Sequence, residues 1–204
     1  MVYKKLSKNE LIELYSKGFS MMEISKKIGC SHHKVAYWFT KYNIKRRTLS
    51  DAIYIKSNPG GDPFHIKEKL SNDDLLLKGY GLGIYWGEGN KVTPHAIRVA
   101  NTDISMLKSF IRFLNIICGV KNNKITYSIV CFNDSVVGEV TDFWARELNI
   151  PVEKFGKIVQ VPQQGKGNYK RKSKYGVCTV SVHNIKLKKW IMDQIQEFSN
   201  ARVV

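Results

Sequence analysis

The stretch from Gly81 to Gly89, Gly-Leu-Gly-Ile-Tyr-Trp-Gly-Glu-Gly, constrains the fold most strongly. It follows an apolar run, Leu75 to Leu77, and we expect both to lie in one helix. Each glycine inside a helix costs about 1 kcal/mol relative to alanine, and Glu88 would face the negative end of the helix dipole. Because these features destabilise an isolated helix, they predict a close approach of another backbone and a carboxylate with a functional position.

The charge of the chain is the second constraint. The 204 residues carry a net charge of +16, with 33 basic and 17 acidic residues, and 43% of them are hydrophobic. That composition predicts a folded core and a polyanionic partner, most often nucleic acid. The alternative is a solvated basic surface without a partner.

The sequence also bears on the compartment. The N-terminal residues have no apolar signal core, and no run approaches the roughly 18 apolar residues of a membrane span. The four cysteines lack zinc-ligand spacing, so we expect free thiols in a reducing compartment. We therefore expect a cytoplasmic or nucleoid-associated protein that binds neither membrane nor small-molecule cofactor. The cysteines are Cys30, Cys118, Cys131 and Cys178.

Breaker residues suggest the domain organisation. Residues 1–50 hold 11 Lys and Arg against 3 Glu and have helical patterning. Residues 51–70 contain the turn-rich Ser57 to Pro63 and predict a linker. A second domain is expected over residues 71–204, where Ser71 or Asn72 can cap the glycine-containing helix.

The periodicity of the second domain changes repeatedly. Alternation and β-branched residues predict strands, and 3.6-residue spacing predicts helices. Together they indicate an α+β domain in which helices are mixed with strand pairs. The expected strands are 96–101, 124–132, 157–161 and 177–183, and the expected helices are 104–118, 136–148 and 184–198.

Residues 20–39 resemble a helix-turn-helix of the kind found in resolvases and small regulators. Ser20 and Ser31 are placed to cap two helices, with Gly29 at the turn between them. The second helix would present its first turns to base edges in a major groove. The alternative is a helical hairpin that docks on the second domain. The expected base contacts are Ser31, His32, His33, Lys34 and Tyr37, the expected phosphate contacts are Lys41, Lys45, Arg46 and Arg47, and Val35, Trp38 and Phe39 should face inward.

The glycine stretch is similar to the motif of LAGLIDADG homing endonucleases. Gly83, Ile84, Gly87, Glu88 and Gly89 match that motif, whereas Leu82 and Trp86 depart from it. The resemblance implies the family's αβ fold over residues 71–204 and a homodimer joined at Gly79, Gly83 and Gly87. It further implies Mg²⁺ held by Glu88 and Gly87, and cleavage of double-stranded DNA.

Several alternatives stay open beside this resemblance. Glu88 can be a surface acid, and the glycines can serve tight helix–sheet packing within one chain. The same scaffold occurs in regulators that bind DNA without cutting it. An RNA-binding splicing helper is a third possibility.

The basic C-terminal half supplies the remaining candidates. Residues 154–192 hold ten Lys and Arg and no acid, which suits phosphate and base contacts, although a disordered basic loop is the alternative. By residue type, Lys166 or Lys172 would stabilise charge at the reacting phosphate, and Asn101 or Gln164 would position water. The further expected DNA contacts are Lys91, Arg98, Gln163, Asn168, Tyr169, Lys170, Arg171, Lys172 and Lys174.

Overall fold

A computed structural model of the protein describes residues 5–162 and 173–200. The chain divides into two units, Met1–Asp62 and Pro63–Val204, which are described separately. Helices and strands are mixed, so the α+β class is confirmed. Within the described ranges, no helix is long and apolar enough to cross a membrane.

The first unit is built from short helices around a small core. Its elements are α1 (Lys8–Ser16), α2 (Met21–Ile28), α3 (His32–Lys41) and α4 (Leu49–Ser57). The core is formed by one aliphatic or aromatic face of each of the first three helices. As expected, α3 contributes Val35, Trp38 and Phe39, which are buried.

The connection between α2 and α3 is a tight turn. Ser20 and Glu23 form a reciprocal capping box at the start of α2, and Ser31 accepts a hydrogen bond from the Lys34 backbone N–H at the start of α3. Between them Gly29 adopts φ +69°, a left-handed conformation that favours glycine. The predicted caps and turn are therefore confirmed.

Helix α4 was not expected, because most of it lies in the expected linker 51–70 and it ends where the turn-rich segment begins. Thr48 and Asp51 form its capping box, a strong local start signal. None of its residues is buried, so the helix has no buried apolar face that helical spacing in the sequence would reveal.

The second unit alternates helices and strands along the chain. Its helices are α5 (Asn72–Glu88), α6 (Ile104–Arg112), α7 (Val137–Leu148) and α8 (Ile185–Asn200). Its strands are β1 (Ala96–Asn101), β2 (Ile125–Phe132), β3 (Phe155–Val161) and β4 (Val177–His183), which confirms all four expected strands. A π-helical turn, Phe113–Ile117, extends α6, and two short 3₁₀ turns, Asn122–Lys124 and Val152–Lys154, precede β2 and β3.

The strands form one mixed sheet with the order β1-β4-β2-β3. Strand β4 pairs antiparallel with β1 and β2, whereas β2 and β3 are parallel. Helix α7 stands between β2 and β3 in the chain, and such crossovers join parallel strands. Strand β4 lies between β1 and β2 and pairs with both.

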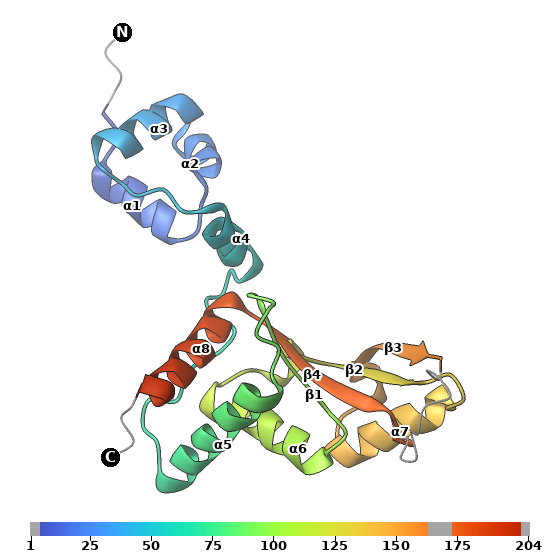
Figure 1. The fold of residues 1–204 in the computed structure, drawn as a ribbon. Helices are drawn as coiled ribbons and strands as arrows, with labels where there is room; N and C mark the ends of the chain where they lie inside the picture. The colour runs from blue at the N-terminus through green and yellow to red at the C-terminus, as the bar shows by residue number, and fades with distance from the viewer. Residues whose placement is uncertain (1–4, 163–172, 201–204) are drawn as a thin grey trace. The chain divides into compact units, whose positions relative to one another are not determined.

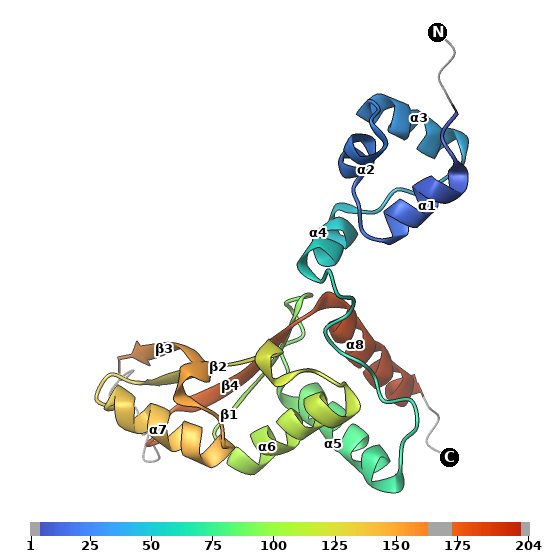
Figure 2. The ribbon, with the colours of Figure 1, turned by 180° about the vertical axis from the view of Figure 1, so that it is seen from behind.

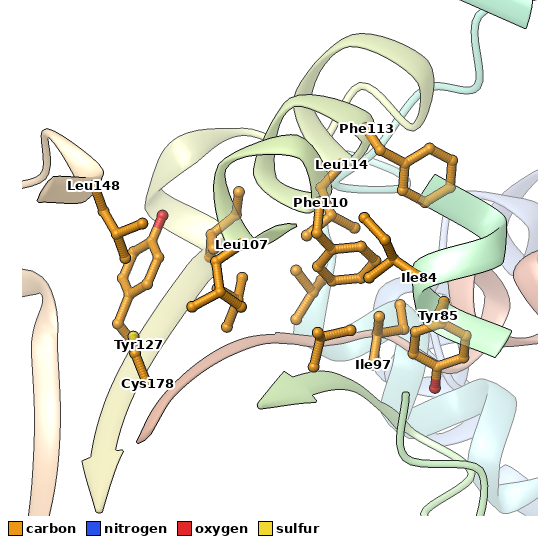
Figure 3. Packing of buried hydrophobic residues seen from close by; sticks show 14 of the residues in the cluster. Ile84, Tyr85, Ile97, Leu107, Phe110, Phe113, Leu114, Tyr127, Leu148 and Cys178 are labelled. Atoms are coloured by element: carbon orange, nitrogen blue, oxygen red, sulfur yellow. The ribbon is translucent and has the colours of Figure 1, made fainter. Parts of the chain in front are cut away.

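The two faces of the sheet differ in character. Alternate residues of β2, from Ile125 to Cys131, are buried, and those between them are not. Figures 1 and 2 show helices α5, α6 and α7 along the same face of the sheet. Figure 3 shows the core between these layers, where Ile84 and Tyr85 of α5 approach Phe110 of α6 and Ile97 of β1.

Residues just before α5 belong to this second unit. The backbone N–H groups of His65 and Lys67 donate to the carbonyls of Cys118 and Ile117, and Phe64 packs against the core. This attachment lies in part of the expected linker 51–70, because apolar residues there find partners distant in sequence.

Candidate nucleic-acid interface

The exposed side of α3 carries a groove. Its volume is about 490 Å³, and its walls combine basic, aromatic and hydroxyl side chains. No acidic side chain is among the described residues that line it. We call it the α3 groove; it is lined by Ser31, His33, Lys34, Tyr37, Trp38 and Lys41.

The groove gathers most of the expected base contacts in one place. Ser31, His33 and Tyr37 are exposed and line it together with Lys34. His32 is half-buried, and its ring centroid lies 6.1 Å from that of His33. Four of the five expected residues therefore share one surface.

The aromatic wall of the groove also holds a cation. The Lys41 ammonium lies 5.0 Å from the ring centroid of Trp38 and 5.7 Å from that of Tyr37. The Trp38 ring stacks on Tyr42 with a centroid distance of 5.0 Å. These contacts hold the Lys41 ammonium over the aromatic wall, and its positive charge suits an anionic ligand.

The two arginines after α3 differ from each other in their surroundings. The Arg47 guanidinium lies 3.8 Å from the Tyr15 ring centroid and donates to the carbonyls of Gly18 and Phe19. Arg46 is exposed and donates to Thr40 Oγ1 at 3.4 Å. Arg47 therefore stabilises the first unit from within, while Arg46 and Lys45 stay at its surface.

The helix-free face of the sheet carries a second basic surface. A hollow of about 410 Å³ lies over it, where Arg98 of β1 and Thr126 of β2 both pair with Ser181 of β4. No acid is among the described side chains around it. We call this the sheet face; it is lined by Arg98, Thr126, Tyr127, Ser128, Gly156, Lys157, Thr179, Ser181 and His183.

Electrostatics on the sheet face favour a neutral histidine. Burial lowers the pKa of His183, and the nearby charges of Arg98 and His95 lower it further. The rings of His95 and His183 are stacked with centroids 6.3 Å apart. An uncharged imidazole beside Arg98 can both donate and accept hydrogen bonds.

The glycines of α5 fall into two groups. A Cβ at Gly81 would lie 2.2 Å from Phe113 Cγ, so this glycine allows α5 to pack closely on the turn after α6. A Cβ at Gly79, Gly83 or Gly87 would meet no atom within 4 Å. Packing within the chain therefore explains Gly81 and leaves the other three unexplained.

The end of α5 is held by lysines. The exposed Lys91 donates to the carbonyls of Trp86 and Gly87 at 2.5 and 3.5 Å. The buried Lys188 donates to the Tyr85 hydroxyl and the Asn90 carbonyl, and burial lowers its pKa. The ammonium of Lys91 caps the C-terminus of α5, and its expected contact with DNA stays a prediction.

The structure describes some of the expected catalytic and DNA-contacting residues and leaves others outside its described ranges. Glu88 is exposed at the end of α5, and the Asn101 side chain accepts a hydrogen bond from the Asp103 backbone N–H. Lys174 is exposed and lies 5.1 Å from the Tyr175 ring centroid. The remaining candidates, Gln163, Gln164, Lys166, Asn168, Tyr169, Lys170, Arg171 and Lys172, lie outside the described residues.

The expected magnesium site has few donors within one chain. No group of three His, Cys, Asp or Glu side chains that could hold a metal was found among the described residues. Of the two expected ligands, the Gly87 carbonyl already faces the Lys91 ammonium. Glu88 alone fits a Mg²⁺ ion poorly, because Mg²⁺ requires near-octahedral oxygen coordination.

Comparison with known families finds a match in the first unit alone. Residues 8–50 match a family described as "Putative ATPase subunit of terminase (gpP-like)". The match spans α1 to α3 and ends at the second residue of α4, about one fifth of the chain. Neither a curated protein nor a solved structure matched the chain.

The resemblance to LAGLIDADG homing endonucleases is therefore wrong. The matching family is a terminase family, and the match lies outside the glycine stretch. Short motifs of small residues recur for packing reasons alone, and Gly81 meets one such need against Phe113.

Proposed function

We propose that this chain binds double-stranded DNA through α3, with α2, the Gly29 turn and α3 acting as a helix-turn-helix. The observation that carries the proposal is the α3 groove, where Lys34 and Lys41 stand among hydroxyl and aromatic groups without an acid. A helix with such a face fits the major groove of B-DNA. It does not fit the deep, narrow major groove of an RNA duplex.

The start of α3 supports an anionic ligand. Its first turn contains no acid and places Lys34 near the positive end of the helix dipole. That placement costs some tenths of a kcal/mol and gains nothing from an ion pair among the described residues. A phosphate beside Lys34 would compensate for this cost.

The family match supports the same function. A terminase family is associated with DNA binding during phage packaging, and the matched residues are those that form α1 to α3. We therefore propose DNA recognition in a packaging-related context. ATP hydrolysis is not part of the proposal, since the sequence contains no G-x-x-x-x-G-K-[ST] phosphate loop.

The sheet face is proposed as a second DNA contact. Arg98 and Lys157 supply positive charge, and the serine and threonine rows supply small hydrogen-bonding groups. Groups of this kind contact phosphates and sugars without reading sequence. The sheet face would therefore add affinity, and α3 would supply most of the specificity.

Self-association through the open face of α5 is the third part of the proposal. Leu76 is 73% exposed and Trp86 is 59% exposed, and the open positions Gly79 and Gly83 lie on the same helix. Small residues between large apolar ones let a second helix approach closely, and an exposed apolar face is typical of an interface. A twofold dimer would bind a roughly palindromic site.

Cleavage by Glu88 and Mg²⁺ stays a prediction. Because one chain offers a single carboxylate, a second one would have to come from another copy. The alternative is a regulator that binds DNA without cutting it. A duplex selected for tight binding and then incubated with Mg²⁺ separates the two: cutting by wild type but not by Glu88→Gln supports the endonuclease, and intact DNA supports the regulator.

Selection of sites from a randomised duplex library tests the binding proposal. We expect wild type to enrich a defined sequence and to bind it more tightly than an RNA duplex of the same length. Arg98→Gln with Lys157→Gln should weaken binding about tenfold on all duplexes while keeping the selected sequence. Preference for the RNA duplex would contradict the proposal and support the splicing-helper alternative.

A further inference from the structure

Helix α4 is a short helix without a buried face. It has nine residues, and none of them is buried. Its large apolar side chains include Leu49, which is 78% exposed, and Ile53, which is 57% exposed. Helices shorter than about 12 residues are marginal in water unless an apolar face packs on a partner. Helix α4 therefore keeps apolar surface that the described part of its own unit does not bury.

One side of α4 lines a groove in the first unit. The groove has a volume of about 600 Å³, and most of its lining surface is apolar. Ile53 contributes to it from α4, and Phe19 and Met21 contribute from the region where α2 begins. We call it the α4 groove; its described lining residues lie between Tyr15 and Glu23 and between Arg47 and Pro59.

Contacts within the unit hold the two lining segments together. Gly18 adopts φ +97°, and a Cβ there would lie 2.9 Å from Ile55 Cγ2, so the chain after α1 packs directly on α4. The Arg47 guanidinium donates to the carbonyls of Gly18 and Phe19. A preformed groove loses less conformational entropy when it binds a ligand.

The charges at the α4 groove are mostly positive. Lys17, Lys56 and Arg47 line it, and Glu23 is the single acid among its described lining residues. The Glu23 carboxylate is already engaged, because it accepts a hydrogen bond from the Ser20 backbone N–H. Lys56 makes no ion pair among the described residues, so its charge is open to a partner.

These properties favour one kind of partner. The phosphates and sugars of DNA supply no apolar side chains to cover Phe19 and Ile53. A second copy of the first unit would bring the same charge, because residues 1–50 hold 11 Lys and Arg against 3 Glu, and like charges repel across an interface. An acidic segment with apolar residues along one side satisfies both requirements.

We propose that the α4 groove binds an acidic amphipathic helix of a partner protein. Apolar side chains at three- and four-residue spacing cover Ile53 and Phe19, and an acid at the edge pairs with Lys56. The α4 groove and the α3 groove share no lining residue. The inference therefore goes beyond DNA binding and does not depend on it.

Peptide selection on the full-length wild-type protein tests the proposal. The probe is a phage-displayed library of peptides about 15 residues long, a length that can form a helix. We expect enriched peptides to combine large apolar residues at helical spacing with Asp or Glu. By fluorescence anisotropy, a selected peptide with every acid changed to Lys should bind about tenfold more weakly. Enrichment of basic peptides, or of none, would contradict the proposal.

Two substitutions on α4 locate the bound peptide. Ile53→Gln removes an apolar contact from the groove and should weaken binding of the selected peptide about tenfold. Leu49→Gln lies on the same helix but outside the described lining, so it should leave affinity unchanged. Both side chains are exposed, and circular dichroism melts check that both variants fold. Wild-type affinity in Ile53→Gln would place the peptide elsewhere and overturn the proposal.

Charge substitutions give a second matched pair. Lys56→Glu should weaken binding of the selected acidic peptide about tenfold. Lys45→Glu changes net charge equally at an exposed position outside the described lining, and should have a smaller effect. Equal losses would show that overall charge, and not the groove, attracts the peptide.

Methyl resonances of the wild-type protein distinguish the other possible occupants. The Ile53 and Met21 methyl signals should move on addition of the selected peptide. The signal of Ile12, which is exposed on α1 outside the described lining, should not. If the Ile53 signal moves with duplex DNA alone, the groove binds DNA. If it moves with protein concentration alone, the groove binds a second copy, and either result would overturn the proposal.

Discussion

Helices α3 and α5 begin alike and differ in what they expose. Each has a serine N-cap, Ser31 in α3 and Ser71 in α5, and each buries one face in its own unit. The third residue after the cap is Lys34 in α3, whereas in α5 it is Asp74, which completes a capping box. An acid there stabilises a helix and a lysine does not. The comparison shows that α5 starts as folding requires, and that α3 departs from that rule where it faces the groove.

The exposed faces of α3 and α5 also differ in chemical character. On α3 the open side is basic and aromatic, with Lys34 and Lys41 beside Tyr37. On α5 it is apolar and smooth, with Leu76, Trp86 and open glycines. A charged open face is suited to a polyanion, and an uncharged one to another protein surface.

Reversing the charge of the α3 face should have the largest effect. Lys34→Glu with Lys41→Glu places two carboxylates in the α3 groove, so duplex affinity should fall more than about 100-fold at low salt. Fluorescence anisotropy at several salt concentrations measures this. The matched control is Lys8→Glu at the start of α1 with Lys17→Glu just after its end, which changes net charge equally. If both double variants lose duplex affinity equally, the effect comes from overall charge and not from the position of the lysines on α3.

A methyl group at Gly81 should strain the buried side of α5. The added Cβ would lie 2.2 Å from the Phe113 side chain, so Gly81→Ala should lower the free energy of unfolding by about 2 kcal/mol. Gly79→Ala, two residues earlier in open space, should raise it by up to about 1 kcal/mol. Urea denaturation compares the pair. If the two substitutions change the free energy of unfolding equally, Gly81 is not packed more closely than Gly79.

Filling the open side of α5 should weaken self-association. A Cβ at Gly83 would meet no atom within 4 Å in the chain, so Gly83→Leu should keep the fold while the dimer dissociation constant rises about tenfold or more through a clash with the second copy. Sedimentation equilibrium gives the measurement. Gly138→Leu in α7, which is also exposed and open, serves as the control. A wild-type chain that is monomeric with and without DNA would contradict an interface on this face.

The smallest expected effect is a pH dependence at the start of α5. Hydrogen bonds from Lys67 and from Ser71 hold the pKa of Asp74 at about 2, below its usual 3.8. Since the folded state resists protonation, this contribution is present above about pH 4 and is lost as the pH falls toward 2. Asp74→Asn should flatten the stability profile over that range in urea titrations, while Asp73→Asn keeps its shape. If Asp74→Asn keeps the wild-type change of stability with pH, the Asp74 carboxylate does not stabilise the start of α5.

Local signals explain most of what could be predicted. The caps at Ser20, Ser31 and Ser71 and the turn at Gly29 follow from side-chain and backbone chemistry within four residues. The strands could be predicted because apolar and polar residues alternate along them, as expected when one face of a sheet is buried and the other is exposed. The inward side of α3 follows from helical spacing.

Long-range pairing explains what could not be predicted. The strand order depends on a crossover helix and on the placement of β4, neither of which leaves a local signal. Arg47 resembles a phosphate contact in sequence, but Tyr15 and the Gly18 carbonyl, about 30 residues earlier, hold its guanidinium. The α4 groove likewise joins side chains from two separate segments of the chain.

By itself, the sequence determined the basic character of the chain, the α+β class, the capped helices and the buried face of α3, because each depends on composition or short-range periodicity. Tertiary structure decided the roles of individual residues. It separated Gly81, packed on Phe113, from the open Gly79, Gly83 and Gly87, and it placed the Arg47 guanidinium against Tyr15 and the Gly18 carbonyl. The physical reason is that a residue's function depends on which distant groups compete for its hydrogen bonds and its space.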